Sequence, residues 1–516
     1  MALMYRDISL SFGVRFAATL IVLPWLNPFA PGPMSALVPW LVALSSVIGM
    51  LGLRAVWWPT PSSDTSALGW AHPAAAAWLL AGALSSAIAL AQYLGLSTSL
   101  SPWINTTPIG EAFGNLRQRN QFASLTNIAL AALLWWSARP RPKQFEKAVR
   151  SSLMVAAVLL GIGNAVSSSR TGLFQSILLL AMAWFWGGLR NPAALRAAIG
   201  FVLAYALALL VLPFMVGLSP WSSGAWARLQ AGDAVCSSRL TLWHNVLTLI
   251  AQQPWRGWGW GELDYAHYIT LYDSPRFCDI LDNAHNLPLH LAVELGVPVS
   301  LLFCGLVIAW VWRSRPWSET DPTRQMAWSV LAVIGLHSLL EYPLWYGPFQ
   351  IATGLCVILL WRKPVTVLIK NRALAQAGYA LVAIILGAAC LYAAWDYHRI
   401  SQIYLSVDAR DPDYRVDTLE KIRSSFLFQD QVRFAELSVT PLTLNNAESQ
   451  YQLALDLLHF SPEHRVIERV IDSALLLGHD DVAVFHLLRL KAAFPDAYAE
   501  WMAAHKPPKT LLKTAP

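Results

Sequence analysis

The chain has 516 residues, of which 56% are hydrophobic and only 13% are charged. Because soluble domains carry about a quarter of charged residues, this composition argues against an ordinary soluble protein and excludes disordered, collagen-like and disulfide-framework chains. The formal net charge of +6 would favour a nucleic-acid partner only if the excess were concentrated on one soluble face.

The charged residues are distributed in two unlike parts. Residues 396–516 carry 13 basic and 17 acidic side chains, a net charge of −4, whereas residues 1–395 carry 24 basic and 14 acidic, a net charge of +10. The first 395 residues are therefore predicted to be a polytopic membrane region, followed by a polar domain of roughly 120 residues. Neither part offers a concentrated basic surface, so no nucleic-acid partner is expected.

Eleven runs are apolar enough to form spanning helices, which need about 20 mostly apolar residues each. The predicted fold is all-α, with about 11 (10–12) transmembrane helices, a long outside loop and a C-terminal helical (tetratricopeptide-like) domain. The first run is expected to be a span rather than a cleaved signal peptide, because a second span follows it directly. The runs lie near 11–29, 35–53, 74–96, 121–138, 151–168, 172–189, 197–216, 297–312, 326–342, 347–361 and 375–395.

Basic residues in the connecting segments indicate the orientation. With the N-terminus in the cytoplasm, the inside connections carry sixteen Lys and Arg residues and the outside segments only seven. An odd number of spans then places the C-terminal domain on the outer face as well. The predicted organisation has four parts: a transmembrane bundle (1–216), a long outside loop (217–296), further transmembrane helices (297–395) and an outside helical domain (396–516).

The long loop contains many tryptophans, which is typical of a segment at the membrane interface. An amphipathic helix lying on the bilayer is predicted from apolar residues at helical spacing. Those residues are Leu240, Trp243, Val246, Leu247 and Ile250. The loop also holds Cys236 and Cys278, while the other three cysteines lie in spans. In an oxidising compartment the two loop cysteines either form a disulfide or remain free thiols, and sequence spacing does not decide between them.

The C-terminal domain is predicted to be a series of helices near 448–460, 463–477, 480–494 and 497–505, with Gly478 and Pro495 as helix stops. Short paired helices resemble tetratricopeptide-like stacking, although the repeat of about 34 residues is not strict. The alternative is a helical domain that packs on the outside loops.

His285 is the leading candidate for general-base catalysis. It ends a polar loop directly before an apolar segment, and an imidazole with a near-neutral pKa suits proton abstraction from a hydroxyl acceptor. The alternative is an interfacial histidine bonded to a backbone carbonyl. Asn286, His290 and Glu294 follow closely, and ionisable groups at a membrane boundary are themselves functional candidates.

Arginines on the predicted outer face are candidates for binding a phosphate group. Arg170 lies between two spans, Arg239 begins the interface helix, and Arg117 and Arg119 precede another span. Guanidinium groups bind phosphate in bidentate fashion, so several of them at a membrane face suit a lipid diphosphate. The alternative is ordinary snorkelling to lipid headgroups.

Acidic residues cluster near His285, but the sequence does not favour a metal site there. No His and Cys pairing of zinc type occurs in the sequence. The glycines of Gly257-Trp-Gly-Trp-Gly261 do not form a nucleotide-binding loop, since the Lys-Ser/Thr ending is absent. The cluster consists of Asp273, Asp279, Asp282 and His285.

Five motifs occur together in a recognisable order: Asn115-Leu-Arg-Gln-Arg-Asn-Gln121, Ser169-Arg-Thr-Gly172, Ser238-Arg239-Leu-x-x-Trp243, Gly257-Trp-Gly-Trp-Gly261 and His285-Asn286-x9-Gly296. With the helical tail they resemble the O-antigen ligase superfamily, most closely its PglL-type protein O-oligosaccharyltransferases. The resemblance covers essentially the whole chain.

The resemblance implies a multi-pass protein of the bacterial inner membrane with a periplasmic active site. It implies transfer of a glycan from an undecaprenyl-diphosphate carrier to a Ser/Thr hydroxyl of a periplasmic protein such as pilin. The sister branch transfers to a lipid A core sugar. No metal or other cofactor is expected, because the diphosphate is itself the leaving group. Attack opposite the diphosphate would invert the anomeric centre.

The resemblance also implies roles for individual residues. His285 would be the base, and Arg170 and Arg239 would hold the diphosphate and stabilise its growing charge. Gln121 and Tyr342 fall near functionally important Gln and Tyr residues of that branch. The remaining alternatives are an O-antigen polymerase, a transporter of the lipid-linked glycan and a membrane scaffold that presents the tail. A transporter would be expected to show paired repeats and charges near the membrane midplane, which the sequence does not show.

Overall fold

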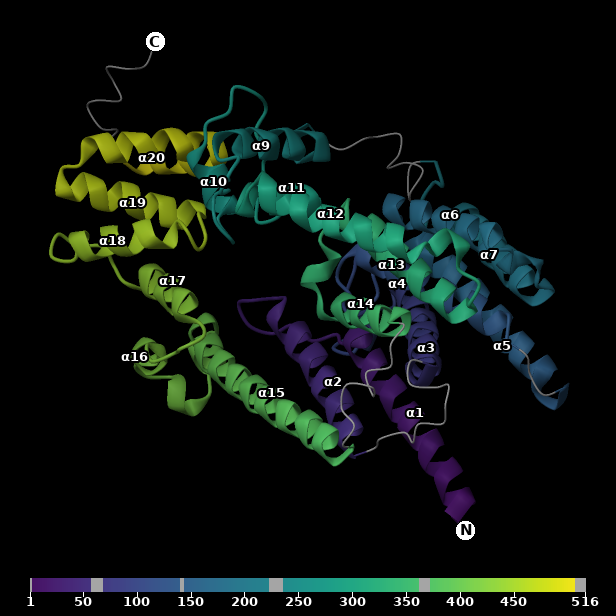
Figure 1. The fold of residues 1–516 in the computed structure, drawn as a ribbon. Coiled ribbons are helices and arrows are strands. Elements are labelled where there is room, and N and C mark those ends of the chain that lie inside the picture. The colour runs from purple at the N-terminus through teal and green to yellow at the C-terminus, as the bar shows by residue number, and fades with distance from the viewer. Residues whose placement is uncertain (1, 57–67, 140–142, 222–234, 362–371, 506–516) are drawn as a thin grey trace. The chain divides into compact units, whose positions relative to one another are not determined.

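The computed structural model describes residues 2–56, 68–139, 143–221, 235–361 and 372–505, and within them all regular structure is helical, as predicted. The chain forms two compact units (Figure 1). The first consists of residues 1–232 and 311–392, and the second of residues 233–310 and 393–516. Thus the predicted periplasmic loop and the predicted C-terminal domain belong to the same unit.

Unit 1 contains α1 (Ala2–Leu26), α2 (Leu37–Val56), α3 (Leu68–Tyr93), α4 (Arg119–Ser137), α5 (Lys143–Val166), α6 (Arg170–Phe185), α7 (Pro192–Met215), α13 (Pro322–Ser338) and α14 (Gly347–Leu360). Two further helices, α12 (Val297–Ser314) and α15 (Arg372–Ser401), each contribute residues to both units. Every one of the eleven predicted apolar runs therefore forms a helix.

Helix α4 is the central helix of unit 1, in contact with α3, α5, α6, α7 and α13. Almost all of its side chains are buried, including the polar Gln121, Ser124, Thr126 and Asn127. Three of these polar side chains form hydrogen bonds with neighbouring helices: Ser124 with Gln175 and His337, Asn127 with the carbonyl of Gly172, and Thr126 with Asn164. Burial of this kind is tolerated only when the polar groups are paired.

Among the described residues, six helices are long and apolar enough to cross a membrane: Leu37–Val56, Gly69–Tyr93, Glu146–Val166, Pro192–Met215, Val297–Ser318 and Arg372–Tyr404. Three shorter apolar helices are Gly13–Leu26, Arg170–Phe185 and Gly347–Leu360. The α12 and α15 spans bury few of their residues within the protein, as expected of helices that face lipid. These features define a multi-pass membrane protein, and the exact number of spans stays a prediction.

Unit 2 includes α9 (Arg239–Gln252), α10 (Leu263–Ile269) and α11 (Leu287–Leu295), which share a core formed by Leu242, Val246, Leu249, Ala266, Phe277, Leu281 and Val293. The predicted interface helix is confirmed as α9. Its Val246 and Ile250 face this core, whereas Leu240 and Leu247 are exposed, so only part of the predicted apolar face packs on protein. That the exposed part contacts the bilayer stays a prediction.

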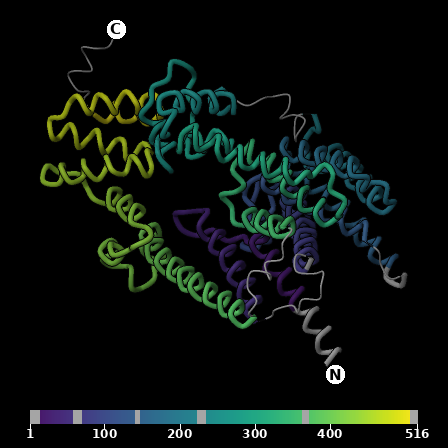
Figure 2. The backbone as a smooth tube through the Cα atoms, in the orientation of Figure 1, coloured from purple at the N-terminus to yellow at the C-terminus, as the bar shows by residue number. Residues whose placement is uncertain are grey.

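The C-terminal part of unit 2 contains α16 (Thr418–Ile422), α17 (Gln429–Val439), α18 (Ala447–Leu457), α19 (His464–Leu477), α20 (Asp480–Ala493) and α21 (Pro495–Ala504). Helices α18, α19 and α20 lie side by side (Figure 2). The four predicted tail helices are confirmed, and Gly478 ends α19 in the left-handed conformation that glycine adopts readily. Pro495 follows the end of α20 at Ala493, as predicted for a helix stop, and it is also the first residue of α21, where the first turn tolerates its missing N–H.

The tail packs against α10 within the same unit. The Tyr268 hydroxyl lies 2.6 Å from Nδ1 of His486, and Arg489 donates to the carbonyl of Ile269 at 2.8 Å. Tyr268 is fully buried in the core of the tail. The loop and tail are therefore held together by a shared core as well as by polar contacts. Eight short 3₁₀ helices connect the elements in the described residues: Thr98–Leu100, Gly188–Arg190, Val235–Ser237, Pro316–Ser318, Pro343–Trp345, Gln402–Tyr404, Val407–Ala409 and Pro412–Tyr414.

Candidate active site

His285 lies in unit 2, in a turn that two asparagines fix directly before α11. The backbone N–H of His285 donates to Oδ1 of Asn283 at 2.9 Å, and Asn286 caps α11 by accepting from the N–H of Leu289 at 3.1 Å. His285 itself has φ +52°, a left-handed conformation that costs free energy for a residue with a Cβ and occurs often at functional sites. Its side chain is half-buried. The local sequence therefore holds this imidazole in one defined place.

The glycine-rich segment Gly257–Gly261 packs backbone to backbone against the end of α11. Gly257 and Gly296 have φ of +69° and +89°. A Cβ on Gly257 would lie 2.3 Å from the carbonyl oxygen of Glu294, and one on Gly296 would lie 2.3 Å from that of Trp255. Three N–H···O bonds join the segments: Trp258 to Val293 at 2.9 Å, Gly259 to Glu294 at 3.0 Å, and Val297 to Pro254 at 2.8 Å. The Gly257–Gly261 motif and the His285–Gly296 motif are therefore in direct backbone contact. Only glycine at positions 257 and 296 permits so close an approach.

Helix α9 brings Arg239 into the same unit as His285. Ser238 caps the helix by accepting from the N–H of Thr241 at 3.1 Å, so Arg239 is its first residue. One turn further on, the indole N–H of Trp243 donates to the carbonyl of Ala284 at 3.2 Å. The helix that begins with Arg239 is therefore tied to the residue directly before His285.

His290 and Glu294 form a buried pair within α11. Nε2 of His290 lies 3.5 Å from Oε2 of Glu294. Burial lowers the pKa of His290 to about 4, and the nearby His285 lowers it further. Burial raises the pKa of Glu294 to about 7, although a hydrogen bond from the backbone of Gly261 opposes the rise. At neutral pH His290 is therefore uncharged, and Glu294 bonds to the backbone of Gly261 in the glycine-rich segment, while a role of the pair in the reaction stays a prediction.

In unit 1 the structure brings together three segments that carry candidate residues. Ser169 caps α6 by accepting from the N–H of Gly172 at 2.9 Å, so Arg170 is the first residue of that helix. The Ser169 hydroxyl donates to Oδ1 of Asn120 at 2.6 Å, and Nδ2 of Asn120 donates to Oε1 of Glu341 at 2.9 Å. The turn before Arg170, the start of α4 and the end of α13 therefore meet at one point.

Gln121 directly follows Asn120 in the sequence, and Tyr342 directly follows Glu341. Gln121 is buried in α4, and its backbone N–H donates to the side chain of Gln118, which caps the helix. Tyr342 is half-buried, and its ring stacks on that of Tyr346 with centroids 5.8 Å apart. Both therefore have defined positions, while their roles stay predictions.

Arg117 and Arg119 make contacts within the loop that precedes α4. Arg117 donates to the carbonyl of Pro28 and has φ +60°. Arg119 forms an ion pair with Glu111 at 2.7 Å. These contacts hold the loop in place, and a role of the two arginines in binding the diphosphate stays a prediction.

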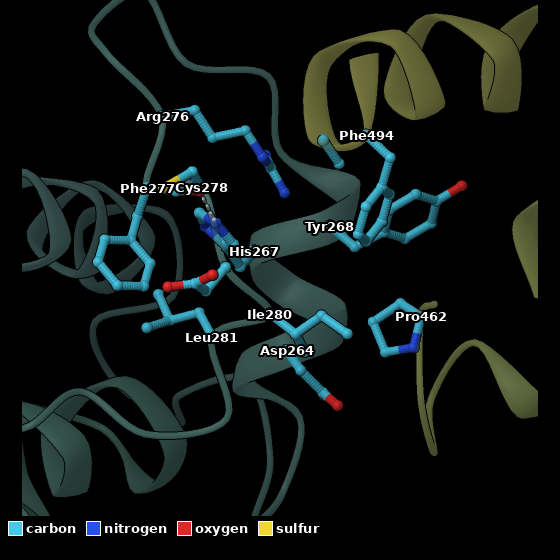
Figure 3. Close-up of a pocket in the computed structure, with 12 residues that line it drawn as sticks. Asp264, His267, Tyr268, Arg276, Phe277, Cys278, Ile280, Leu281, Pro462 and Phe494 are labelled. Carbon is cyan, nitrogen blue, oxygen red and sulfur yellow. Dashed lines mark hydrogen bonds between the residues drawn. The ribbon is translucent and has the colours of Figure 1, made fainter. Parts of the chain in front are cut away.

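A small pocket in unit 2 lies between α10, residues 276–281 and the tail (Figure 3). Burial raises the pKa of Asp264 to about 7 and lowers that of His267 to about 3. His267 is hydrogen-bonded through both ring nitrogens, to the Tyr272 hydroxyl at 2.8 Å and the Phe277 carbonyl at 3.2 Å. The cavity measures about 10 Å³, about enough for one water molecule. It is too small for a sugar or a diphosphate, so these residues stabilise the fold.

Cys236 and Cys278 are neighbours, as a disulfide would require. The N–H of Cys278 donates to the carbonyl of Cys236 at 3.0 Å, while both thiols are exposed and unbonded in the structure. Burial, and then the neighbouring Cys236, raise the pKa of Cys278 to about 11. The disulfide stays a prediction. Among the described residues, no group of three or more His, Cys, Asp or Glu residues is placed to hold a metal ion.

Sequence reasoning did not single out Asn120, Ser169 or Glu341, the three side chains that meet in unit 1. The signal was present, since Asn120 and Ser169 lie beside Gln121 and Arg170 in the motifs themselves. Only the fold shows that they contact one another.

Three family models match successive parts of the chain. One described as "Protein glycosylation ligase" matches residues 112–136, one described as "O-Antigen ligase" matches residues 155–304, and one described as "Virulence factor membrane-bound polymerase, C-terminal" matches residues 325–508. The first two include the Arg-Gln-Arg-Asn-Gln, Arg170, Arg239 and His285 motifs. The resemblance to the O-antigen ligase superfamily is therefore confirmed.

The chain also resembles protein-glycosylating ligases. A "General O-oligosaccharyltransferase" of Acinetobacter baylyi (strain ATCC 33305 / BD413 / ADP1) is 27% identical over 289 residues, which cover 52% of this chain and 47% of the relative. A "ComP-specific O-oligosaccharyltransferase" of the same strain is 25% identical over 248 residues, 48% of this chain and 43% of the relative. The chain thus spans about half the length of the curated relatives it matches.

Proposed function

We propose that the protein is a glycosyltransferase of the bacterial inner membrane that moves an oligosaccharide en bloc to a periplasmic protein. The donor is an undecaprenyl-diphosphate-linked glycan and the acceptor is a Ser/Thr hydroxyl, as in a pilin. The observation that carries the proposal is the arrangement in unit 2, where Trp243 ties the Arg239 helix to the turn that holds His285. Two relatives named as O-oligosaccharyltransferases support it.

The proposed reaction is a single displacement. His285 takes the proton from the acceptor hydroxyl, whose oxygen forms a bond to the anomeric carbon while the bond from that carbon to the diphosphate oxygen breaks. The leaving undecaprenyl diphosphate keeps the electron pair, and its growing negative charge is stabilised by Arg170 and Arg239. Attack from the side opposite the leaving group inverts the anomeric configuration. The activated donor supplies the driving force, so the proposal includes no metal or cofactor.

The orientation belongs to the same proposal. The basic residues of the connecting segments support a cytoplasmic N-terminus, with the His285 turn and the C-terminal domain in the periplasm. Labelling of single introduced cysteines with a membrane-impermeant reagent tests it. Labelling from the periplasm is expected at residue 459 and none at residue 190, and the reverse pattern would overturn the orientation.

A second candidate function is an O-antigen ligase that transfers the glycan to a lipid A core sugar. The match of residues 155–304 to the model described as "O-Antigen ligase" favours it, and it differs only in the acceptor. The test mixes the purified protein and an undecaprenyl-diphosphate-linked glycan with either a pilin or lipid A core. A mass increase of the pilin supports the first function, and a glycan added only to lipid A core would replace it with the second.

A further inference from the structure

Asn120 links a helix cap to a carboxylate in unit 1. The Ser169 hydroxyl donates to the Asn120 oxygen at 2.6 Å, and the Asn120 nitrogen donates to the Glu341 carboxylate at 2.9 Å. Ser169 is fully buried and Glu341 is 9% exposed. Hydrogen bonds to a charged group and away from bulk water are among the stronger ones in proteins.

The direction of each hydrogen bond in this chain is determined. Ser169 accepts from the N–H of Gly172 at 2.9 Å, so its own proton is available to Asn120. The oxygen of the Asn120 amide therefore faces Ser169, and its NH₂ group faces Glu341. All the bonds point the same way, from the first turn of α6 toward the carboxylate, and bonds in such a chain strengthen one another.

A second polar network holds the same helices together deeper in unit 1. Gln175 of α6 donates to the Ser124 hydroxyl of α4 at 2.7 Å and to the carbonyl of Val333 in α13 at 3.1 Å. Ser124 also lies 2.9 Å from Nδ1 of His337. The three helices thus remain attached to one another when a bond at their ends is altered, so variants of Asn120 and Glu341 are expected to fold.

The link through Asn120 acts on the residue that follows the cap. Ser169 sets where α6 begins, and Arg170 is its first residue. Gly172 lets α6 approach α4 closely, since a Cβ there would lie 2.5 Å from that of Ala123. Misplacement of a charged group by about 1 Å can cost two orders of magnitude in rate, so a fixed start of α6 matters for a guanidinium that binds a diphosphate.

We propose that Asn120 and Glu341 are positioning residues that fix the start of α6 and thereby hold Arg170 in place for the donor diphosphate. The inference rests on the proposed function for the identity of that ligand. Asn120 and Glu341 act on the position of Arg170 through Ser169 and do not themselves contact the donor.

The test exchanges the two ends of one hydrogen bond. In Asn120→Asp, two carboxylates face each other and the donor to Glu341 is lost. In the double variant Asn120→Asp/Glu341→Gln, the new amide of residue 341 donates to the new carboxylate of residue 120, which still accepts from Ser169. Glu341→Gln alone keeps an acceptor for the Asn120 NH₂ group. Glu146→Gln, on the exposed ion pair with Arg150, is the matched control.

Each full-length variant is placed in nanodiscs of phosphatidylethanolamine and phosphatidylglycerol. Affinity for undecaprenyl diphosphate is measured by thermophoresis, with undecaprenyl phosphate for comparison, and donor KM and kcat are measured in the transfer assay. We expect Asn120→Asp to weaken diphosphate binding about tenfold or more and to raise the donor KM. The double variant and Glu341→Gln should recover to within about threefold of the parent, and Glu146→Gln should match it.

The inference is overturned if Asn120→Asp binds undecaprenyl diphosphate as tightly as the parent, or if the double variant stays as weak as the single one. A general folding role predicts an equal effect on the donor KM and the acceptor KM. The two proposals fail separately. A parent protein whose affinity for undecaprenyl diphosphate depends on Asn120, but which transfers glycan to neither acceptor, would refute the function and retain the inference.

Discussion

The indole N–H of Trp243 donates to the carbonyl oxygen of Ala284 at 3.2 Å, and Ala284 directly precedes His285. This bond joins the helix that begins with Arg239 to the turn that holds the proposed base. It makes the relative position of two proposed site residues depend on a single side chain in the same unit.

Trp243→Phe is expected to lower the transfer rate about tenfold, because the ring remains but the link to Ala284 is lost. The measurement is kcat for glycan transfer in the reconstituted assay. Trp255→Phe, which alters an exposed ring, is the matched control. Equal rates for the two variants would show that the bond has no part in positioning His285.

Gly296→Ala is expected to destabilise unit 2 markedly. The new Cβ would lie 2.3 Å from the Trp255 carbonyl, at φ +89°, and the unfavourable φ alone costs about 1–3 kcal/mol. The thermal midpoint in size-exclusion chromatography measures the effect. Gly305→Ala, whose Cβ meets nothing within 4 Å, should leave the midpoint unchanged. A stable Gly296→Ala protein would contradict the close backbone approach.

His486→Asn is expected to make the packing of the tail less sensitive to acid. Burial lowers the pKa of His486 from 6.5 to about 4, so as the pH falls the unfolded chain takes up the proton first and the parent loses stability between pH 6.5 and 4. The full loss is about 3 kcal/mol. Asn keeps an acceptor near the Tyr268 hydroxyl and does not titrate.

Unfolding midpoints of the parent and of His486→Asn at pH 7 and pH 5 test this prediction. Groups other than His486 titrate alike in both proteins, so they cancel in the comparison. The parent should lose more stability than the variant between the two pH values. Parallel losses would show that His486 is not buried in its neutral form.

Because Cys236 and Cys278 are neighbours, we expect them to form a disulfide if their loop lies in the oxidising periplasm. Denatured protein treated with a maleimide mass tag should then carry three tags without reductant and five with it, because the chain has five cysteines. Five tags under both conditions would show that the two thiols remain free.

Much of the fold follows from local sequence patterns. Long apolar runs, the spacing of Val246 and Ile250 on α9 and the position of Gly478 all act within one helix, so they are visible in the sequence. The segments α16 and α17 were not predicted. Helix α17 nevertheless buries Val432, Ala435 and Leu437.

Site geometry was predictable only in part. The residue types near His285 and Arg170 indicated the chemistry, because imidazole and guanidinium have few roles at a membrane face. The link from Ser169 through Asn120 to Glu341 joins residues up to 221 positions apart. Such a contact depends on helix packing, which no local pattern encodes. The contact between Gly257 and Glu294 is a second example. The motifs that contain these residues can be recognised in the sequence, but the contact between them cannot.

The central claim is that His285 removes the acceptor proton, and its substitution tests this most directly. His285→Asn is the preferred variant, because Asn tolerates the φ of +52° better than other residues but does not act as a base. Transfer of glycan from undecaprenyl diphosphate to a pilin is followed by mass spectrometry, with His244→Asn on the exposed side of α9 as control. The account predicts that His285→Asn still binds undecaprenyl diphosphate and transfers glycan about 10²- to 10⁴-fold more slowly than the parent. Transfer at the rate of the parent would contradict it.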